Sequence, residues 1–263
     1  TCALPISPDR AEQLRRAANA AVDKALPIND PQGALYGTLF DGVRRKAGEE
    51  LAHRVLHPLL RDLLDGYRFE GGYILAKPPG AGRLDAHQHQ PVTSDIFEPA
   101  VHCWLTIDDA GPTTGGLRLV PGSHRLTRHV QSFETASYFS TFCETLEQSY
   151  MRSLDLRAGQ TVIFERSLLH GSSPNDSAEP RLRILGTAIP SESQLCILSE
   201  TEPGSFDALE VGGATIDPEL FCIARDNPAR LRLAGRIDNR NEALSIEEFR
   251  ALLRSGDRKS TRL

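Results

Sequence analysis

The chain has 263 residues and a formal net charge of -5, and 40% of its residues are hydrophobic and 25% charged. These proportions are typical of a globular protein that buries a substantial core, and we expect one domain with helical additions. The acidic balance provides no basic stripe that could follow a phosphate backbone, which excludes nucleic acid as the expected ligand. A small-molecule substrate is expected instead, and the oligomeric state stays open.

The sequence shows no targeting signal in its first residues. No apolar run reaches the roughly 18 residues of a membrane span, and TCALPISPDRAEQL lacks the basic start and apolar core of a signal peptide, so we expect a cytoplasmic protein without a membrane partner. The five cysteines are scattered and show no CxxC spacing, which argues against a disulfide framework and a thiolate zinc site. Thr1 is not an initiator, and residues 257–263, DRKSTRL, resemble a translated sequencing adapter that we expect to be non-native.

Helices are predicted for the N-terminal part, residues 1–66. Ser7 and Pro8 are typical of a helix cap followed by proline at the first helical position, and AEQLRRAANAAVDKAL continues as an amphipathic helix. A second helix is predicted roughly over residues 42–64, where apolar residues recur at spacings that suit one buried face.

Short strands are predicted from Tyr67 onward. Apolar runs such as YRFEGGYILA, VHCWLTI, QTVIF and RILGTAI are separated by glycine and proline, a pattern that favours a sandwich or jelly roll over residues 67–200. The polar and aromatic segment 127–153 is expected to be a partly helical excursion over the barrel mouth. In the C-terminal extension, residues 201–256, Ser245 and Glu248 predict a capping box before a short helix.

Three histidines form a candidate metal site. His87 and His89 in LDAHQHQ are two residues apart, so on a strand they project to the same face, and His170 follows the strand QTVIFE. Neutral imidazole binds iron and zinc, and an enzyme site needs three protein ligands with the remaining positions open. The spacing alone also fits hydrogen-bonded surface histidines. Arg181, in the segment after His170, is suited to a bidentate grip on the far carboxylate of a dicarboxylic cosubstrate.

Three segments in chain order, KPPGAGRLDAHQHQ, WLTIDDAGPTTGGLRLVPGSHR and LRAGQTVIFERSLLHGSSPNDSAEPRLRI, resemble consecutive blocks of the phytanoyl-CoA dioxygenase family. The resemblance covers roughly residues 67–190. It implies a mainly β fold with flanking helices, a cupin-like double-stranded β-helix or jelly roll. It also implies a non-haem iron(II) dioxygenase that uses 2-oxoglutarate and O2 and hydroxylates, or otherwise oxidises, a small organic substrate.

The resemblance also assigns roles to individual residues. It places iron on His87 and His170, and 2-oxoglutarate on Arg181 with Ser172 assisting. Weaker correspondences with the cosubstrate pocket are Tyr73, Gln88 and Trp104, and ordinary aromatic packing competes with this role for Tyr73 and Trp104.

Position 89 departs from the family pattern, which has a carboxylate ligand there. Three neutral imidazoles leave the site one charge unit more positive than two imidazoles and a carboxylate. His89 can be a ligand in an all-histidine site, Asp95 or Asp85 can supply the carboxylate, or activity can be lost. We rank His89 first and Asp95 second, and the retained Arg181 opposes loss of activity.

Two other functions are compatible with the sequence. One is a three-histidine dioxygenase that does not use 2-oxoglutarate, and the other is a catalytically inactive jelly-roll binding protein. Four further polar groups are expected to be structural: Lys77 as a solvated lysine at a strand end, Asp108 in a turn, His102 as a hydrogen-bonded barrel histidine, and His53 with His57 on a helix surface. The sequence does not define the substrate.

Overall fold

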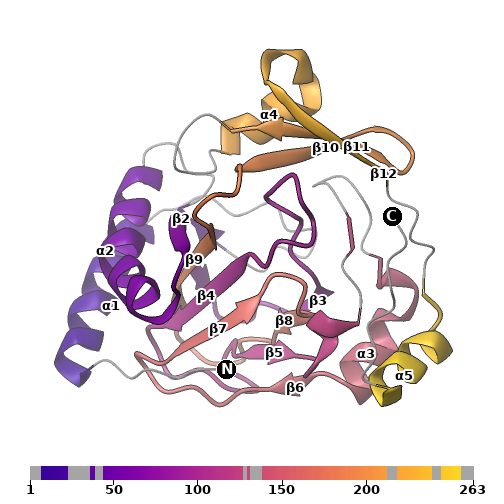
Figure 1. Ribbon diagram of the computed structural model, residues 1–263. Coiled ribbons are helices and arrows are strands. Elements are labelled where there is room, and N and C mark those ends of the chain that lie inside the picture. The colour runs from indigo at the N-terminus through magenta and orange to yellow at the C-terminus, as the bar shows by residue number, and fades with distance from the viewer. Residues whose placement is uncertain are drawn as a thin grey trace.

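Two antiparallel sheets form the centre of the computed structural model, which describes residues 7–22, 36–38, 44–126, 129–130, 138–211, 218–238 and 244–255. The expected non-native tail, residues 257–263, lies outside these ranges. The fold is mainly antiparallel β with flanking helices, the jelly roll expected from the sequence (Figure 1).

The described strands lie in three sheets. The five-stranded sheet has the order β1 (Tyr36–Gly37), β2 (Tyr67–Lys77), β9 (Arg181–Pro190), β4 (Val101–Thr106) and β7 (Thr161–Glu165). The four-stranded sheet has the order β3 (Leu84–His87), β8 (His170–Ser172), β5 (Leu117–Leu119) and β6 (Arg152–Ser153). A third sheet consists of β10 (Cys196–Glu202), β11 (Ser205–Glu210) and β12 (Leu233–Asp238). The third sheet therefore begins inside the core range expected to end at residue 200, and the expected domain bounds stay a prediction.

Helices cover the outer faces of these sheets. The helices α1 (Pro8–Val22) and α2 (Arg45–Leu63) lie together against the outer face of the five-stranded sheet, whereas α4 (Pro218–Asp226) lies beside the third sheet (Figure 1). The helices α3 (Cys143–Ser149) and α5 (Ile246–Ser255) pack at the other side of the molecule, and short 3-10 turns cover Ser123–Arg125, Ser140–Phe142 and Pro228–Arg230. None of the described helices is long and apolar enough to span a bilayer.

The predicted helix starts are confirmed. Arg10 donates its backbone N–H to Ser7 Oγ over 3.4 Å, and α1 begins at Pro8. Ser245 and Glu248 exchange the two hydrogen bonds of a capping box, 2.9 Å from Ser245 N–H and 3.2 Å from Glu248 N–H. In the described part of segment 127–153, α3 supplies the expected helix.

Strand β2 shows how alternation divides the molecule into two apolar layers. Ile74 packs outward with Leu56 of α2, whereas Leu75 packs inward with Trp104 and with Leu117 of the opposite sheet. Gly72 permits the close approach of β9, because a Cβ there would lie 2.2 Å from a β9 carbonyl oxygen. The inward residues therefore define a closed interior between the two main sheets.

Candidate metal centre and cosubstrate pocket

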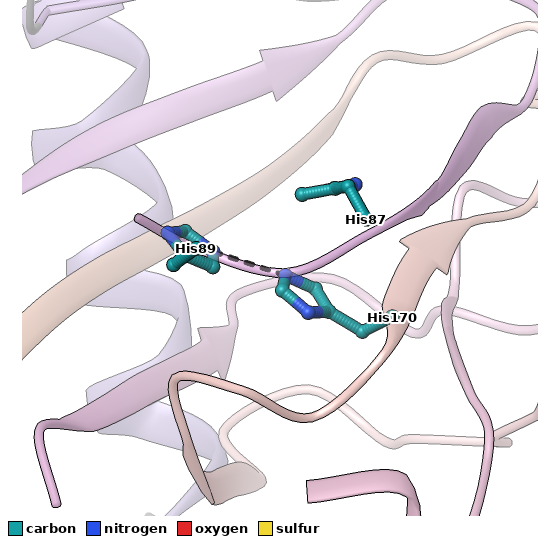
Figure 2. A group of neighbouring side chains, drawn as sticks. All are labelled: His87, His89 and His170. Atoms are coloured by element: carbon teal, nitrogen blue, oxygen red, sulfur yellow. Dashed lines mark hydrogen bonds between the residues drawn. The ribbon is translucent and has the colours of Figure 1, made fainter. Parts of the chain in front are cut away.

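Strand pairing brings the three predicted histidines together. His87 at the end of β3 lies opposite His170 at the start of β8 in an antiparallel pair, and His89 follows two residues later. One ring nitrogen from each histidine lies within 4.8 Å of the other two. Figure 2 shows the three imidazoles gathered around one point, with His89 and His170 facing each other. The three histidines predicted from the sequence thus form a cluster whose size suits one metal ion.

Hydrogen bonds to the backbone fix two of the rings. His87 Nδ1 lies 2.8 Å from the Asp85 carbonyl oxygen, and His170 Nδ1 lies 2.8 Å from the Leu168 carbonyl oxygen. A carbonyl oxygen only accepts, so each Nδ1 carries the proton and each Nε2 keeps a lone pair. Such a backbone bond on the second nitrogen is what orients metal-binding histidines in general. Both rings are therefore in the tautomer that a metal site requires.

His89 is held by contacts on both sides. Its backbone N–H donates to the Arg166 carbonyl oxygen over 3.0 Å, and the buried Arg166 guanidinium donates to the His89 carbonyl oxygen over 3.3 Å. The His89 ring stacks on His102, with 4.0 Å between the ring centres. Although His89 lies beyond the end of β3, its backbone and ring are both fixed.

Burial favours the neutral form of His89 and His170. Desolvation lowers the pKa of His89 well below its usual value, with smaller contributions from His102, His87 and Arg166. Desolvation likewise lowers the pKa of His170, and His87 and His89 lower it further. Neutral imidazole is the ligating form, so the donor set fits a divalent ion of the iron or zinc type.

Neither alternative carboxylate joins the three histidines. The exposed Asp95 accepts the backbone N–H of Phe97 over 2.8 Å, which caps a local turn. Asp85 forms an ion pair with Arg83 at 2.9 Å, and its carboxylate groups with Cys143 and Glu147 rather than with the three histidines. Asp95 as a replacement for His89 stays a prediction that these positions do not favour.

Two of the predicted cosubstrate residues, Arg181 and Ser172, lie on strands of the two main sheets. Arg181 is the first residue of β9, and its Nε is buried without a hydrogen-bond partner. Ser172 on β8 is fully buried, and its Oγ accepts a hydrogen bond from Lys77 Nζ over 2.9 Å. The expectation that Lys77 is solvated is wrong, because this lysine is 0% exposed. Because Lys77 lies on the inward face of β2, its side chain crosses the interior and reaches Ser172 of β8.

Tyr73 and Trp104 lie on the inward face of the five-stranded sheet, on either side of Leu185. Burial raises the pKa of Tyr73 to about 12, so its phenol is neutral at ordinary pH. Gln88 points elsewhere, because its amide donates to the Ser167 carbonyl oxygen and accepts the His129 backbone N–H. The contacts of Tyr73, Trp104 and Gln88 with a cosubstrate stay predictions.

Sequence reasoning missed Arg183. It lies two residues after Arg181 in RLRI, so the alternation of β9 directs both side chains to the interior, and this spacing could have identified it. His102 was expected to be a hydrogen-bonded barrel residue, and its Nδ1 bonds Thr187 Oγ1 at 3.1 Å while its buried Nε2 has no partner. The expectation for His102 is thus confirmed for one nitrogen.

Part of this chain matches a protein-family model and is similar in sequence to two plant proteins. The family model described as phytanoyl-CoA dioxygenase (PhyH) matches residues 5–182. Phytanoyl-CoA dioxygenase 1 of Oryza sativa subsp. japonica is 28% identical over 111 residues, which cover 41% of this chain and 40% of the relative. Phytanoyl-CoA dioxygenase of Arabidopsis thaliana is 25% identical over 122 residues, which cover 44% of this chain and 43% of the relative. The matched stretches thus span about two fifths of these relatives.

Solved structures share the fold at low identity. The non-haem α-ketoglutarate-dependent carbocyclase SnoK from nogalamycin biosynthesis aligns with a TM-score of 0.59 and 18% identity, over 73% of this chain and 80% of its own. The epimerase SnoN from the same biosynthesis aligns with a TM-score of 0.56 and 16% identity, over 73% of this chain and 79% of its own. HygX from Streptomyces hygroscopicus, solved with nickel, 2-oxoglutarate and hygromycin B, aligns with a TM-score of 0.50 and 16% identity, over 72% of this chain and 82% of its own.

Proposed function

Because the chain belongs to the phytanoyl-CoA dioxygenase family, we propose that it is a non-haem iron(II) and 2-oxoglutarate-dependent oxygenase that oxidises a small organic substrate. The observation that carries this proposal is the cluster of three histidine ring nitrogens within 4.8 Å of one another, in a barrel that also buries Arg181 Nε without a hydrogen-bond partner among the described residues. The histidine nitrogens are donors that suit a divalent metal ion, and the Arg181 guanidinium suits a carboxylate.

Each residue has a defined task in this proposal. His87, His89 and His170 hold the iron, and their backbone contacts orient the rings before the metal binds. Arg181 grips the distal carboxylate of 2-oxoglutarate, and the Ser172 hydroxyl adds a hydrogen bond from the facing strand. When bound, iron supplies the redox chemistry by which O2 converts 2-oxoglutarate to succinate and carbon dioxide while a substrate C–H bond is oxidised.

The barrel wall limits side reactions. Apolar side chains from both main sheets line the interior around the site and exclude water from it; they include Leu75, Trp104, Leu117, Leu119, Phe164 and Leu185. The solved structures with a similar fold include a carbocyclase and an epimerase. The fold therefore does not determine the outcome of the oxidation, which depends on the substrate and its contacts. We propose hydroxylation as the outcome for this chain.

Anaerobic titration of the metal-free protein with iron(II) and 2-oxoglutarate tests the proposal. We expect the visible charge-transfer band of chelated 2-oxoglutarate in the parent and a weaker band in Arg181→Gln. Arg61→Gln, on the exposed surface of α2, is the matched control that keeps the parent band. Absence of the band in the parent contradicts the proposal.

The histidine at position 89 favours one second candidate, a three-histidine dioxygenase that needs no cosubstrate. This candidate predicts O2 consumption with substrate in the absence of 2-oxoglutarate. The proposed function predicts strict dependence of turnover on 2-oxoglutarate and formation of succinate.

A further inference from the structure

A second arginine lies in the interior beside Arg181. Arg183 is 2% exposed, and its guanidinium carbon lies 4.5 Å from the centre of the Trp104 ring. Its Nη1 donates to the Gly115 carbonyl oxygen over 3.3 Å. Its Nε and Nη2 are buried, and no described residue forms a hydrogen bond with them. Two strong donors of this guanidinium thus point into the interior without an acceptor.

Gly115 marks the place where three cationic side chains meet. A Cβ on Gly115 would lie 3.1 Å from Lys77 Cδ and 3.7 Å from Arg181 Cβ, and its carbonyl oxygen binds Arg183. Arg181 and Arg183 are two residues apart on one strand, which separates their Cα atoms by roughly 7 Å and leaves both long side chains within reach of one ligand.

No described carboxylate balances the charge of the two arginines in this cluster. Among the described residues, no carboxylate forms an ion pair with Arg181 or Arg183. Burial lowers the pKa of Arg183 to about 9, so the side chain stays charged at neutral pH. The nearby Tyr73 is a neutral phenol and supplies no negative charge. An unpaired buried cation is costly, which indicates that an anion belongs beside it.

We propose that Arg183 is a second anchor for a dicarboxylic ligand, so that one carboxylate is held between the guanidiniums of Arg181 and Arg183 in front of the Trp104 ring. A carboxylate has enough lone-pair sites to accept from both arginines. The identity of the ligand as 2-oxoglutarate rests on the proposed function, whereas the two-arginine site itself does not. Because the pair holds a single carboxylate, it favours an ionised acid over the uncharged amide of the same length.

Trp104 provides a direct probe, because it is the single tryptophan of the chain and Arg183 lies over its ring. The metal-free protein is titrated with glutarate, which has two carboxylates but no 2-oxo group, and with glutaramide, the uncharged diamide of the same length. We expect a saturable change in Trp104 emission with glutarate and a much weaker response to glutaramide. Equal responses to the two compounds would overturn the inference.

Calorimetric titration of variants with glutarate tests the role of each arginine. Arg183→Gln is expected to weaken binding about tenfold or more, as the loss of a hydrogen bond to a charged group does. Arg181→Gln is expected to act similarly, and the double variant to lose less than the product of the two effects, because both arginines hold one carboxylate. Arg183→Lys, which keeps the charge, should be intermediate, and Arg61→Gln should match the parent.

Thermal unfolding separates ligand binding from a purely structural role. If Arg183 binds a carboxylate, Arg183→Gln unfolds at the same or a higher temperature than the ligand-free parent, but glutarate stabilises it less than it stabilises the parent. If Arg183 only packs against Trp104, the ligand-free variant unfolds earlier and glutarate affinity is unchanged, which overturns the inference. Should Arg183→Gln not fold, an affinity of Arg183→Lys equal to that of the parent overturns it as well.

The two proposals can fail independently. Glutarate binding that depends on both arginines, together with no charge-transfer band for iron(II) and 2-oxoglutarate, would remove the oxygenase and keep the two-arginine site. A normal band with parent-like glutarate affinity in Arg183→Gln would keep the oxygenase and remove the role of Arg183.

Discussion

The Nε2 atoms of His89 and His170 lie 3.0 Å apart, although the two residues are separated by 81 positions in the sequence. His170 Nδ1 already carries a proton toward the Leu168 carbonyl oxygen, so its Nε2 presents a lone pair to His89. A hydrogen bond between the rings or a shared cation can satisfy this pair of nitrogens, and His87 beside them favours the cation (Figure 2).

Removal of the His89 ring should therefore weaken metal binding. Loss of a residue that only supports a metal ligand lowers metal affinity about 10–100-fold. We expect His89→Ala, which removes a ligand itself, to lower nickel(II) affinity at least as much. The alternative ligand supplies the control, because Asp95→Asn should keep parent affinity if Asp95 only caps its turn. Calorimetric titration of the metal-free proteins with nickel(II) measures both. Stronger weakening in Asp95→Asn than in His89→Ala would show that the carboxylate is the third ligand.

Lys77 and Ser172 should act together on the cosubstrate. Lys77 Nζ donates to Ser172 Oγ over 2.9 Å, which holds the hydroxyl that faces the pocket. Lys77→Met should weaken 2-oxoglutarate binding to the nickel-loaded protein severalfold, and Ser172→Ala should weaken it less in that background than in the parent. Lys46→Met, at an exposed position of α2, is the control for loss of one positive charge. Fully additive effects would contradict a coupled pair.

The buried His129 should make the protein sensitive to acid. Burial lowers the pKa of His129 from 6.5 to about 4. The unfolded chain therefore protonates this histidine below pH 6.5, whereas the folded chain protonates it only below about pH 4. Its stabilising contribution is therefore present above pH 6.5 and lost as the pH falls from 6.5 to 4. From the two pKa values, the loss at pH 5 is about 2 kcal/mol.

His129→Phe removes this titration and keeps a ring that can stack on Tyr138. The free energy of unfolding, measured with urea at pH 7 and pH 5, should fall about 2 kcal/mol less in the variant than in the parent. An equal fall in both proteins would exclude His129 as a source of the acid sensitivity.

The contact between α2 and the five-stranded sheet should contribute strongly to the free energy of unfolding. Leu56 is 0% exposed and lies against Gly186 of β9, where an added Cβ would come within 2.7 Å of Leu56 Cδ1. Leu56→Ala should lower the free energy of unfolding by about 2–5 kcal/mol, the usual cost of such a cavity. Leu63→Ala on the same helix is the control, because Leu63 is 41% exposed and should change stability by about 0.5 kcal/mol or less.

Much of this molecule is determined by local sequence. The caps at Ser7 and Ser245, the helical periodicity of α1 and α2 and the alternation of the strands each arise from neighbouring residues, and the structure confirms them. The spacing of His87 and His89 and the segment around His170 likewise identified the cluster from the sequence, although the strand ends at His87 and hydrogen bonds with Arg166 hold His89 beyond it.

Tertiary structure alone decided the surroundings of those residues. The local sequence around Lys77 predicts a surface lysine. In the structure, the packing of β8 against β2 buries Lys77 and supplies Ser172 as a hydrogen-bond partner. In the same way, Arg183 becomes an unpaired buried cation only because β4 brings Trp104 over it and Gly115 approaches from another loop. Burial and charge pairing depend on contacts between distant segments, and these contacts set the cost of leaving a charge unpaired.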